Sequence, residues 1–188
     1  CTWMFGRDLV NWNNNFTWAK WVTPSRDLIS TFKQEGDEVR FKESVVYYDC
    51  GWSNYYPSDN YPFMYKCRSA NSSIIKYRYA DVLLLKAEAL IMQDTPDLEG
   101  AADIIDEVRD RAKLGALSSS TRSNKDALLN ALLKERRLEL AFEGQRWFDL
   151  VRLDKVEEVM NAVHAKDSGR KAQVYTYDKN SYRLPIPQ

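Results

Sequence analysis

Residues 135–152 read ERRLELAFEGQRWFDLVR, a stretch in which four acidic residues and four arginines alternate with apolar side chains. Three of the acidic residues, Glu135, Glu139 and Glu143, are spaced four apart and therefore share one face of a helix. Such carboxylates could perform acid–base catalysis. They could equally be held by arginines from a neighbouring helix, because the planar guanidinium group matches a carboxylate. We predict this structural ion network, since nothing in the sequence indicates a cleft beside these groups.

The second half of the stretch contains a turn followed by two aromatic rings. Gly144 interrupts the helical pattern, and Trp147 and Phe148 stand directly before Asp149. A further helix is expected over residues 145–159. We predict that the two rings fill the core, while Asp149 and the other charged groups tie neighbouring helices together.

The region upstream of this stretch has the periodicity of amphipathic helices from Tyr77 onwards. The apolar face of the first helix, with offsets of three and four, consists of Ala80, Leu83, Leu84, Ala87, Leu90 and Ile91. Tyr77 and Tyr79, at its start, are expected in the core. Helices joined in pairs by short connections predict a mostly α fold of tetratricopeptide-like helical pairs.

The boundaries of the next two helices are predicted from their capping residues. Thr95 and Pro96 favour a helix start, and Gly115 favours a helix end, so a second helix is expected between them. Ser123 and Asp126 have the spacing of a capping box, which predicts the start of a third helix after the polar linker.

Residues 1–76 differ from the helical part in composition. They are rich in tryptophan, tyrosine, asparagine and proline and have no persistent helical period, which predicts an irregular, aromatic-rich segment. Two exceptions are a short helix capped by Ser25 and a strand or hairpin through residues 39–47, where apolar residues partly alternate. We therefore divide the chain into this segment, the candidate ligand region, and a helical C-terminal region of residues 77–188, which together form one domain fragment.

The charge balance excludes one large class of partners. Acidic and basic residues number 27 each, which argues against a nucleic-acid-binding protein, because such proteins carry a clustered basic surface. The longest apolar runs, such as Val82–Leu85, are far shorter than the roughly 20 residues of a membrane-spanning helix.

The cysteines and the single histidine do not have the spacing of a metal site. Cys50 and Cys67 could pair across a loop, which would leave Cys1 over, and no CxxC motif is present. His164 has no partner cysteine at zinc-binding spacing, so we expect neither a metal nor another cofactor.

Four blocks of sequence occur in a specific order and spacing. They are RYADVLLLKAEAL (78–90), AADIIDEVRDRAKL (101–114), ERRLELAFEGQRWFDLVR (135–152) and RLPIPQ (183–188). This ordered set resembles the C-terminal region of the SusD/RagB family. The stretch PSRDLISTFKQEGDEVR (24–40) is similar to the family's upstream segment, so the resemblance covers about residues 22–188.

The resemblance implies a function as well as a fold. Members of this family are surface lipoproteins of Bacteroidota that serve polysaccharide utilisation and have no enzymatic activity. They sit beside a TonB-dependent transporter in the outer membrane and capture glycans, or in some members peptides, for import. Members are usually longer, with an N-terminal helical half and a lipidated cysteine. We therefore expect this chain to be a C-terminal piece, with the lipid anchor upstream of it.

The aromatic-rich segment supplies the chemistry that glycans require. Aromatic rings cover the apolar CH faces of sugars, while amide, carboxylate and guanidinium groups meet their hydroxyls. The candidate ligand-binding residues are Trp3, Trp12, Trp18, Arg7, Asp8, Asn13, Trp52 and Tyr55. The alternative for the tryptophans is burial in the core or in an interface, and for residues 49–63 it is a loop pinned by its aromatic side chains.

Three other functions compete with glycan capture. A peptide-binding member of the same family would use a groove with contacts to a sheet edge. A helical scaffold that contacts only protein would gather its tryptophans in one apolar patch. A glycoside hydrolase would need two carboxylates facing a cleft, and no spacing in the sequence favours such a pair.

Overall fold

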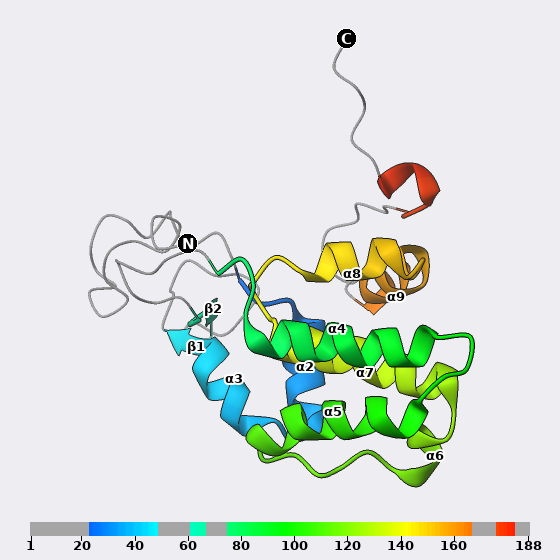
Figure 1. The fold of residues 1–188 in the computed structure, drawn as a ribbon. Coiled ribbons are helices and arrows are strands. Elements are labelled where there is room, and N and C mark those ends of the chain that lie inside the picture. The colour runs from blue at the N-terminus through cyan, green and yellow to red at the C-terminus, as the bar shows by residue number, and fades with distance from the viewer. Residues whose placement is uncertain (1–22, 49–60, 67–74, 167–175, 183–188) are drawn as a thin grey trace. The chain divides into compact units, whose positions relative to one another are not determined.

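The computed structural model describes residues 23–48, 61–66, 75–166 and 176–182 (Figure 1). The chain divides into two compact units, residues 1–143 and residues 144–188, which are described separately below. The predicted division after residue 76 rests on a change in composition and stays a prediction. The described part is mostly helical, so the predicted fold class is confirmed.

Two short helices begin the described part of the first unit: α2 (Arg26–Glu35) and α3 (Glu38–Ser44). The Ser25 hydroxyl accepts a hydrogen bond from the Leu28 amide at 3.1 Å, so the predicted cap of α2 is confirmed. Gly36 ends the helix with a φ of 68°, a left-handed conformation that glycine adopts without steric cost.

The stretch predicted as a strand or hairpin divides between a helix and a strand. Its first part lies in α3, because the Asp37 carboxylate accepts a hydrogen bond from the Arg40 amide and starts a helix there. Its second part is β1 (Val45–Tyr48), which pairs with β2 (Tyr61–Met64) in an antiparallel two-stranded sheet. The predicted strand is confirmed, but it begins only at Val45, and its partner lies outside the predicted stretch.

Three longer helices pack against one another in the first unit: α4 (Tyr79–Met92), α5 (Leu98–Arg111) and α7 (Lys125–Glu139). Their shared core consists of Leu84, Ala87, Ile91, Ala101, Ala102, Ile105, Val108, Leu128 and Leu132. Three of these residues are alanines, which allow the helix backbones to approach closely. The predicted apolar face of α4 therefore packs against α5 and α7 in one core.

The ends of α5 differ from the predicted ones on both sides. Asp97 caps the helix in place of Thr95, and its carboxylate accepts a hydrogen bond from the Gly100 amide at 2.9 Å. The helix ends at Arg111, before Gly115. Asp97 is the cap because it directly precedes the first helical residue, so its side chain can reach the free amides of the first turn.

The polar linker before α7 contains a short helix, α6 (Ser119–Arg122), that the periodicity did not predict. Asn124 caps α7 by accepting a hydrogen bond from the Ala127 amide at 2.9 Å. The capping box expected at Ser123 and Asp126 is therefore wrong by one residue.

The start of α4 contradicts another prediction. Tyr77 and Tyr79 are 80% and 72% exposed, so they do not lie in the core of the first unit.

The first unit contains a second, smaller core. It contains Leu28, Phe32, Leu138 and Ala141 and packs α2 against the end of α7.

The second unit contains α8 (Arg146–Arg152), α9 (Val156–Lys166) and a short 3-10 helix, η3 (Lys179–Tyr182). The single helix predicted over residues 145–159 is thus two helices. Asp154, in the break, has a left-handed φ of 53°, which a continuous right-handed helix cannot include.

The two aromatic residues of α8 have different environments. Trp147 is partly buried, whereas Phe148 is 66% exposed, so the prediction that both rings fill the core is wrong for Phe148. Asp149 is buried, and its Oδ1 lies 2.8 Å from Arg152 Nη2. Consecutive residues of a helix point in different directions, so two adjacent rings are rarely buried to the same extent.

Candidate functional site

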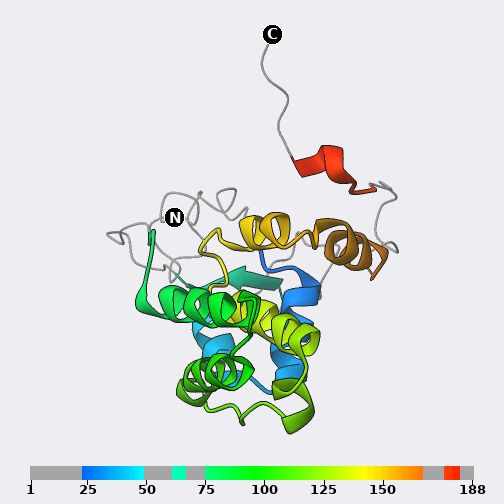
Figure 2. The same cartoon turned by 45° about the vertical axis from the view of Figure 1, so that its right-hand side comes forward.

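Helix α7 lies between the α4–α5 pair and α2 in the first unit (Figure 2). Its last two turns carry Glu135 and Glu139 on one face, and Glu143 follows in the turn after the helix. Glu135 and Glu139 are only 1% and 3% exposed. Because a lone buried carboxylate is costly, both groups need cationic or hydrogen-bonding partners.

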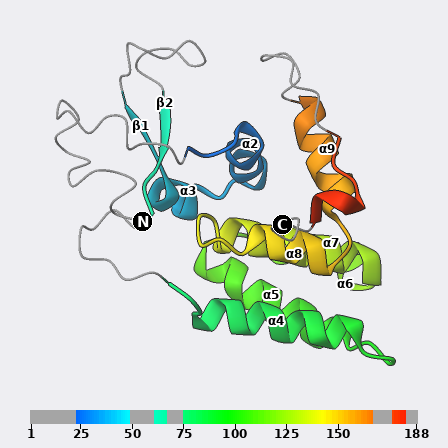
Figure 3. The ribbon, with the colours of Figure 1, turned by 90° about the horizontal axis from the view of Figure 1, so that it is seen from above.

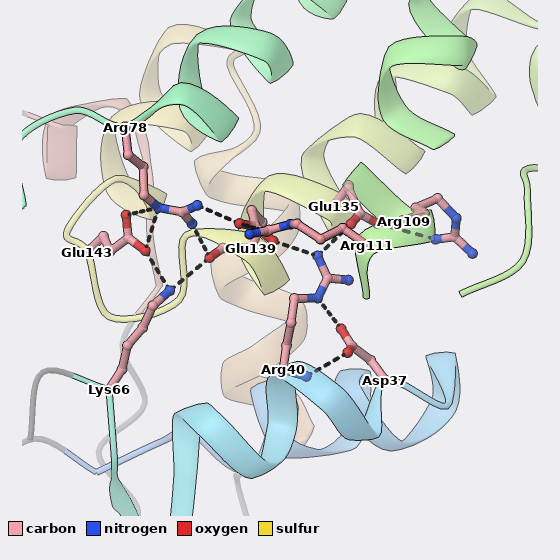
Figure 4. Close-up of polar contacts among 9 residues, drawn as sticks. All are labelled: Asp37, Arg40, Lys66, Arg78, Arg109, Arg111, Glu135, Glu139 and Glu143. Carbon is pink, nitrogen blue, oxygen red and sulfur yellow. Dashed lines mark hydrogen bonds and ion pairs between the residues drawn. The ribbon is translucent and has the colours of Figure 1, made fainter. Parts of the chain in front are cut away.

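Glu139 contacts three arginines from three different places in the chain (Figure 4). Arg78 Nη1, just before α4, lies 2.5 Å from Oε1, and Arg40 Nη1, on α3, lies 3.1 Å from Oε2. Arg111, the last residue of α5, also pairs with Oε1. One carboxylate therefore ties α3, α4 and α5 to α7.

Glu135 has a similar arrangement one turn earlier. Arg40 Nη1 lies 2.6 Å from its Oε1, and Arg109 Nη1 lies 3.3 Å from its Oε2. The Nε atom of Arg40 lies 2.5 Å from Asp37 Oδ2. Arg40 thus bridges three carboxylates, those of Asp37, Glu135 and Glu139.

Glu143 completes the network at the end of α7. Arg78 Nε lies 2.8 Å from its Oε2, and Lys66 Nζ lies 2.5 Å from its Oε1. Both cations also donate to the Glu139 carbonyl, at 2.5 Å from Arg78 Nη2 and 2.8 Å from Lys66 Nζ. Cations at this position also interact favourably with the negative end of the helix dipole.

Burial and the arginines act on the carboxyl pKa values in opposite directions. For Glu139, burial raises the pKa, but hydrogen bonds and charges from Arg78 and Arg111 outweigh burial and lower the pKa to about 2. For Glu135, burial also raises the pKa, and Arg40 and Arg109 only partly offset it. Burial therefore outweighs the arginines for Glu135, whereas the arginines outweigh burial for Glu139.

A cleft of about 430 Å³ opens beside the network. Its walls combine the cations Lys66, Arg78 and Arg111 with apolar residues such as Val39 and Ile75. Glu139 and Glu143 also line it, and each is already paired with arginine or lysine. The charged wall of the cleft is therefore built from ion pairs.

This geometry favours the structural reading of the glutamates. Glu135 is not part of the cleft wall, so Glu135 and Glu139 do not form a pair of carboxylates facing one substrate. Both carboxylates are held in place by arginines from neighbouring elements. The predicted ion network is confirmed.

Within the described ranges, no cluster of side chains suits a metal ion, and no helix is long and apolar enough to cross a bilayer.

The predicted ligand-binding residues lie outside the described part of the chain. Those in the first segment are Trp3, Arg7, Asp8, Trp12, Asn13 and Trp18, and those in the second are Trp52 and Tyr55. The possible pairing of Cys50 with Cys67 also lies outside it. Glycan binding at these residues stays a prediction.

The cations that hold the glutamates lie too far away along the chain to be predicted from the sequence. Arg40 and Glu135 are 95 residues apart, and Arg78 and Glu139 are 61 residues apart. The only local signal is the position of Arg109 and Arg111 in the last turn of a predicted helix, where cations are favourable in any case.

Comparison with known protein families supports the fold and the assignment of the helical part. Residues 58–188 match the model of the SusD family. The chain is 41% identical over 106 residues to SusD-like protein P38 of Formosa agariphila, a match that covers 53% of this chain and 21% of that protein. It is 35% identical over 125 residues to SusD-like protein P2 of the same organism, covering 64% and 24%. The chain thus spans about a quarter or less of these relatives' lengths.

A solved structure shows the same fold. The crystal structure of a SusD superfamily protein from Bacteroides vulgatus aligns with a TM-score of 0.59 and 23% sequence identity. The alignment covers 81% of this chain and 39% of that chain. The arrangement of helices described above is therefore similar to part of a larger protein.

Proposed function

Because the chain belongs to the SusD family, we propose that it forms the helical scaffold of a non-catalytic surface protein that captures oligosaccharides for import. The observation that carries this proposal is the family match over residues 58–188. The ion pairs of Glu135 and Glu139 support a binding role, since a hydrolase would need both carboxylates free to face the substrate.

The proposed ligand-binding residues belong to residues 1–22 and 49–60. β1 ends at Tyr48 and β2 begins at Tyr61, and these two residues are partners across the sheet. The residues that flank the second segment on the scaffold therefore lie side by side. Binding residues are frequently carried on loops that a rigid scaffold positions, which supports a role for Trp52 and Tyr55.

The proposed partner is a TonB-dependent transporter in the outer membrane, and the proposed location is the cell surface. Both follow from the family resemblance, as does a lipid anchor outside residues 1–188. The expected result is that the protein, extracted from outer membranes with a mild detergent, copurifies with such a transporter. Recovery of the protein without any transporter would contradict this part of the proposal.

Isothermal titration calorimetry with a panel of glycans tests which ligand the protein binds. We expect at least one oligosaccharide to bind the full-length protein. Trp3→Ala, Trp12→Ala or Trp18→Ala should raise its Kd about tenfold, which corresponds to about 1.4 kcal/mol of lost stacking and burial. The control is Tyr77→Ala, which removes an exposed ring from the described part of the chain and should leave Kd unchanged.

The same panel separates the competing functions. Binding of extended peptides but of no glycan would favour a peptide-capturing member of the family. Glycan binding that none of the tryptophan variants weakens would disprove the proposed residues. Release of shorter sugars during the titration would disprove the non-catalytic role.

A further inference from the structure

The cleft of about 430 Å³ beside the ion network carries more positive than negative charge in its described wall. Lys66, Arg78 and Arg111 line it together with Glu139 and Glu143. Arg78 and Arg111 share the carboxylate of Glu139. Lys66 and Arg78 share the carboxylate of Glu143. This group of side chains therefore has one more cation than it has carboxylates.

Arg111 has donors that its ion pair does not use. Its side chain is 61% exposed, and it contacts Glu139 through Nη2. Among the described residues, Nε and Nη1 have no partner. A guanidinium group offers its N–H donors in a planar fork that matches the two oxygens of a carboxylate. Arg111 can therefore keep its pair with Glu139 and bind a second oxyanion.

Arg40 gives an independent indication that this wall favours an anion. It lines the cleft, and its side chain is only 10% exposed. Its Nε and Nη1 atoms pair with carboxylates, whereas Nη2 is buried and has no hydrogen-bond partner (Figure 4). A buried donor without an acceptor costs free energy. Negative charge in the cleft offsets this cost.

The other part of the wall is apolar and consists of Val39, Ile75, Ala112 and Leu138. Val39 and Ile75 are 41% and 37% exposed. An inorganic ion has no use for apolar surface, whereas the carbon skeleton of an organic anion can cover it. The cleft volume also lies within the range of about 300–1,000 Å³ that is usual for small-molecule sites. The site therefore suits an organic acid.

The cleft lies at one end of the β1–β2 hairpin. Ser44, the last residue of α3, and Lys66, just after β2, both line it. The hairpin extends from α3 (Figure 3). Tyr48 and Tyr61, which flank the second candidate segment, are paired at the other end of the hairpin. A strand of four residues spans about 13 Å, a distance that an oligosaccharide crosses within a few sugar units.

The segment of the chain that joins two residues of the wall lacks the chemistry to fill this site. Residues 67–74 connect Lys66 with Ile75 and contain Arg68 but no acidic residue. Glu43 also belongs to the wall, but it is exposed, so water screens its charge. The surplus positive charge is therefore not answered by these parts of the chain.

We propose that the cleft binds the carboxylate-bearing ring of an acidic sugar. Arg111 and Lys66 donate to the carboxylate, and Val39 and Ile75 contact the ring. Lys66 has a donor for this purpose, because its ammonium group has three and the printed sequence neighbours Glu139 and Glu143 use two of them. The inference rests on the proposed function and narrows the captured oligosaccharides to those with a uronic acid unit.

Saturation-transfer NMR on the full-length protein tests the proposal with two sugars. Methyl β-D-glucuronide and methyl β-D-glucoside differ only in a carboxylate in place of a hydroxymethyl group. We expect the glucuronide to bind about tenfold more tightly, because charge-assisted hydrogen bonds are stronger than neutral ones. Equal Kd values, or no binding of the glucuronide, would overturn the proposal. Binding of a neutral oligosaccharide in the calorimetric panel would then still support the proposed function.

A pair of variants at Val39 tests whether the sugar binds in this cleft. Val39→Asp places a carboxylate on the wall, and Val39→Asn places a neutral side chain of the same shape there. We expect Val39→Asp to raise the Kd of the glucuronide about tenfold relative to Val39→Asn, because like charges repel. The same Kd for both variants would show that the anion binds elsewhere and would overturn the proposal.

A second pair of variants tests the role of Arg111. Arg111→Gln and Lys33→Gln each remove one positive charge from the last turn of a helix, but only Arg111 lines the cleft. We expect the first to raise the Kd of the glucuronide about tenfold and the second to leave it unchanged. Equal effects of the two variants would reduce Arg111 to a contribution of general charge and would overturn its assigned role.

Two further results would overturn the proposal by naming another occupant. Sodium sulfate that displaces the glucuronide with an equal or lower Kd, at constant ionic strength, would make the cleft a site for inorganic oxyanions. Glucuronide binding that appears only after Asp49→Asn or Asp59→Asn would show that a carboxylate of the chain itself occupies the cleft. We expect neither result.

Discussion

Among single residues, Glu139 shows how a charge can be buried at the centre of a scaffold. Its carboxylate forms ion pairs with Arg40, Arg78 and Arg111, which replace the water that would surround it in the unfolded chain. Its backbone carbonyl accepts hydrogen bonds from two cations. A buried ion pair gains little stability over an apolar pair of the same shape, but removing one partner leaves the others unpaired. The network therefore specifies which elements meet around α7 more than it adds to the free energy of unfolding.

The first prediction concerns the loss of this hub. Glu139→Ala leaves three arginines without one of their acceptors, so we expect the free energy of unfolding to fall by about 3–5 kcal/mol. Urea denaturation followed by circular dichroism measures the change. Glu99→Ala is the matched control, because Glu99 is an exposed carboxylate paired with Arg122 and should change stability little. Equal losses for the two variants would contradict the role of Glu139.

The second prediction concerns pH. The folded protein lowers the pKa of Glu139 from its ordinary 4.5 to about 2. A carboxyl group with a lowered pKa stabilises the folded state above pH 4.5, and this contribution is lost as the pH falls toward 2. The difference in unfolding free energy between the wild type and Glu139→Gln should therefore shrink over this range. Glu135 is present in both proteins, so its raised pKa affects both. A difference that does not change with pH would refute the lowered pKa.

At the scale of helices and strands, capping residues decide where each element begins. α2, α5 and α7 each start at a side chain that accepts a hydrogen bond from an amide of the first turn, namely those of Ser25, Asp97 and Asn124. The apolar period predicts that a helix is present, but several polar residues near its start can compete for the cap. In α5 and α7 the cap is the residue immediately before the first helical residue, because its side chain is placed to accept a hydrogen bond from an amide of the first turn.

The third prediction compares the two candidate caps of α5. Asp97→Ala removes the acceptor of the Gly100 amide and should cost about 1 kcal/mol of stability. Thr95→Ala should cost almost nothing, since Thr95 lies outside the helix. The midpoint of urea denaturation, measured for both variants, distinguishes them. A larger loss for Thr95→Ala would restore the cap that the sequence alone suggested.

At the scale of the first unit, an apolar core and an ion network make different contributions to the fold. The core between α4, α5 and α7 supplies most of the burial, and the network around Glu135 and Glu139 attaches α3 and the N-terminal end of α4 to it. Hydrophobic packing is not directional, whereas hydrogen-bonded ion pairs demand particular partners. The first therefore holds the helices together, and the second sets how they are arranged.

The fourth prediction tests the core. Leu132 on α7 is fully buried among the three helices. Leu132→Ala should lower the free energy of unfolding by about 2–5 kcal/mol, because it removes buried carbon atoms and leaves a cavity. Asn130→Ala, at an exposed position of the same helix, serves as the control and should have little effect. A similar, small change for both would mean that α7 does not carry the core.

The sequence by itself determined that the three long helices are present and what kind of contact the glutamates make. The apolar period marks α4, α5 and α7, and the spacing of Glu135, Glu139 and Glu143 indicates one charged face, because both signals depend only on neighbours a few residues away. Tertiary structure decided the rest. Arg40 meets Glu135 across 95 residues of chain, and no local pattern encodes such a pairing. Likewise, Phe148 and Tyr79 are exposed although both are aromatic. A side chain's burial depends on which other elements reach it, and only the folded chain contains that information.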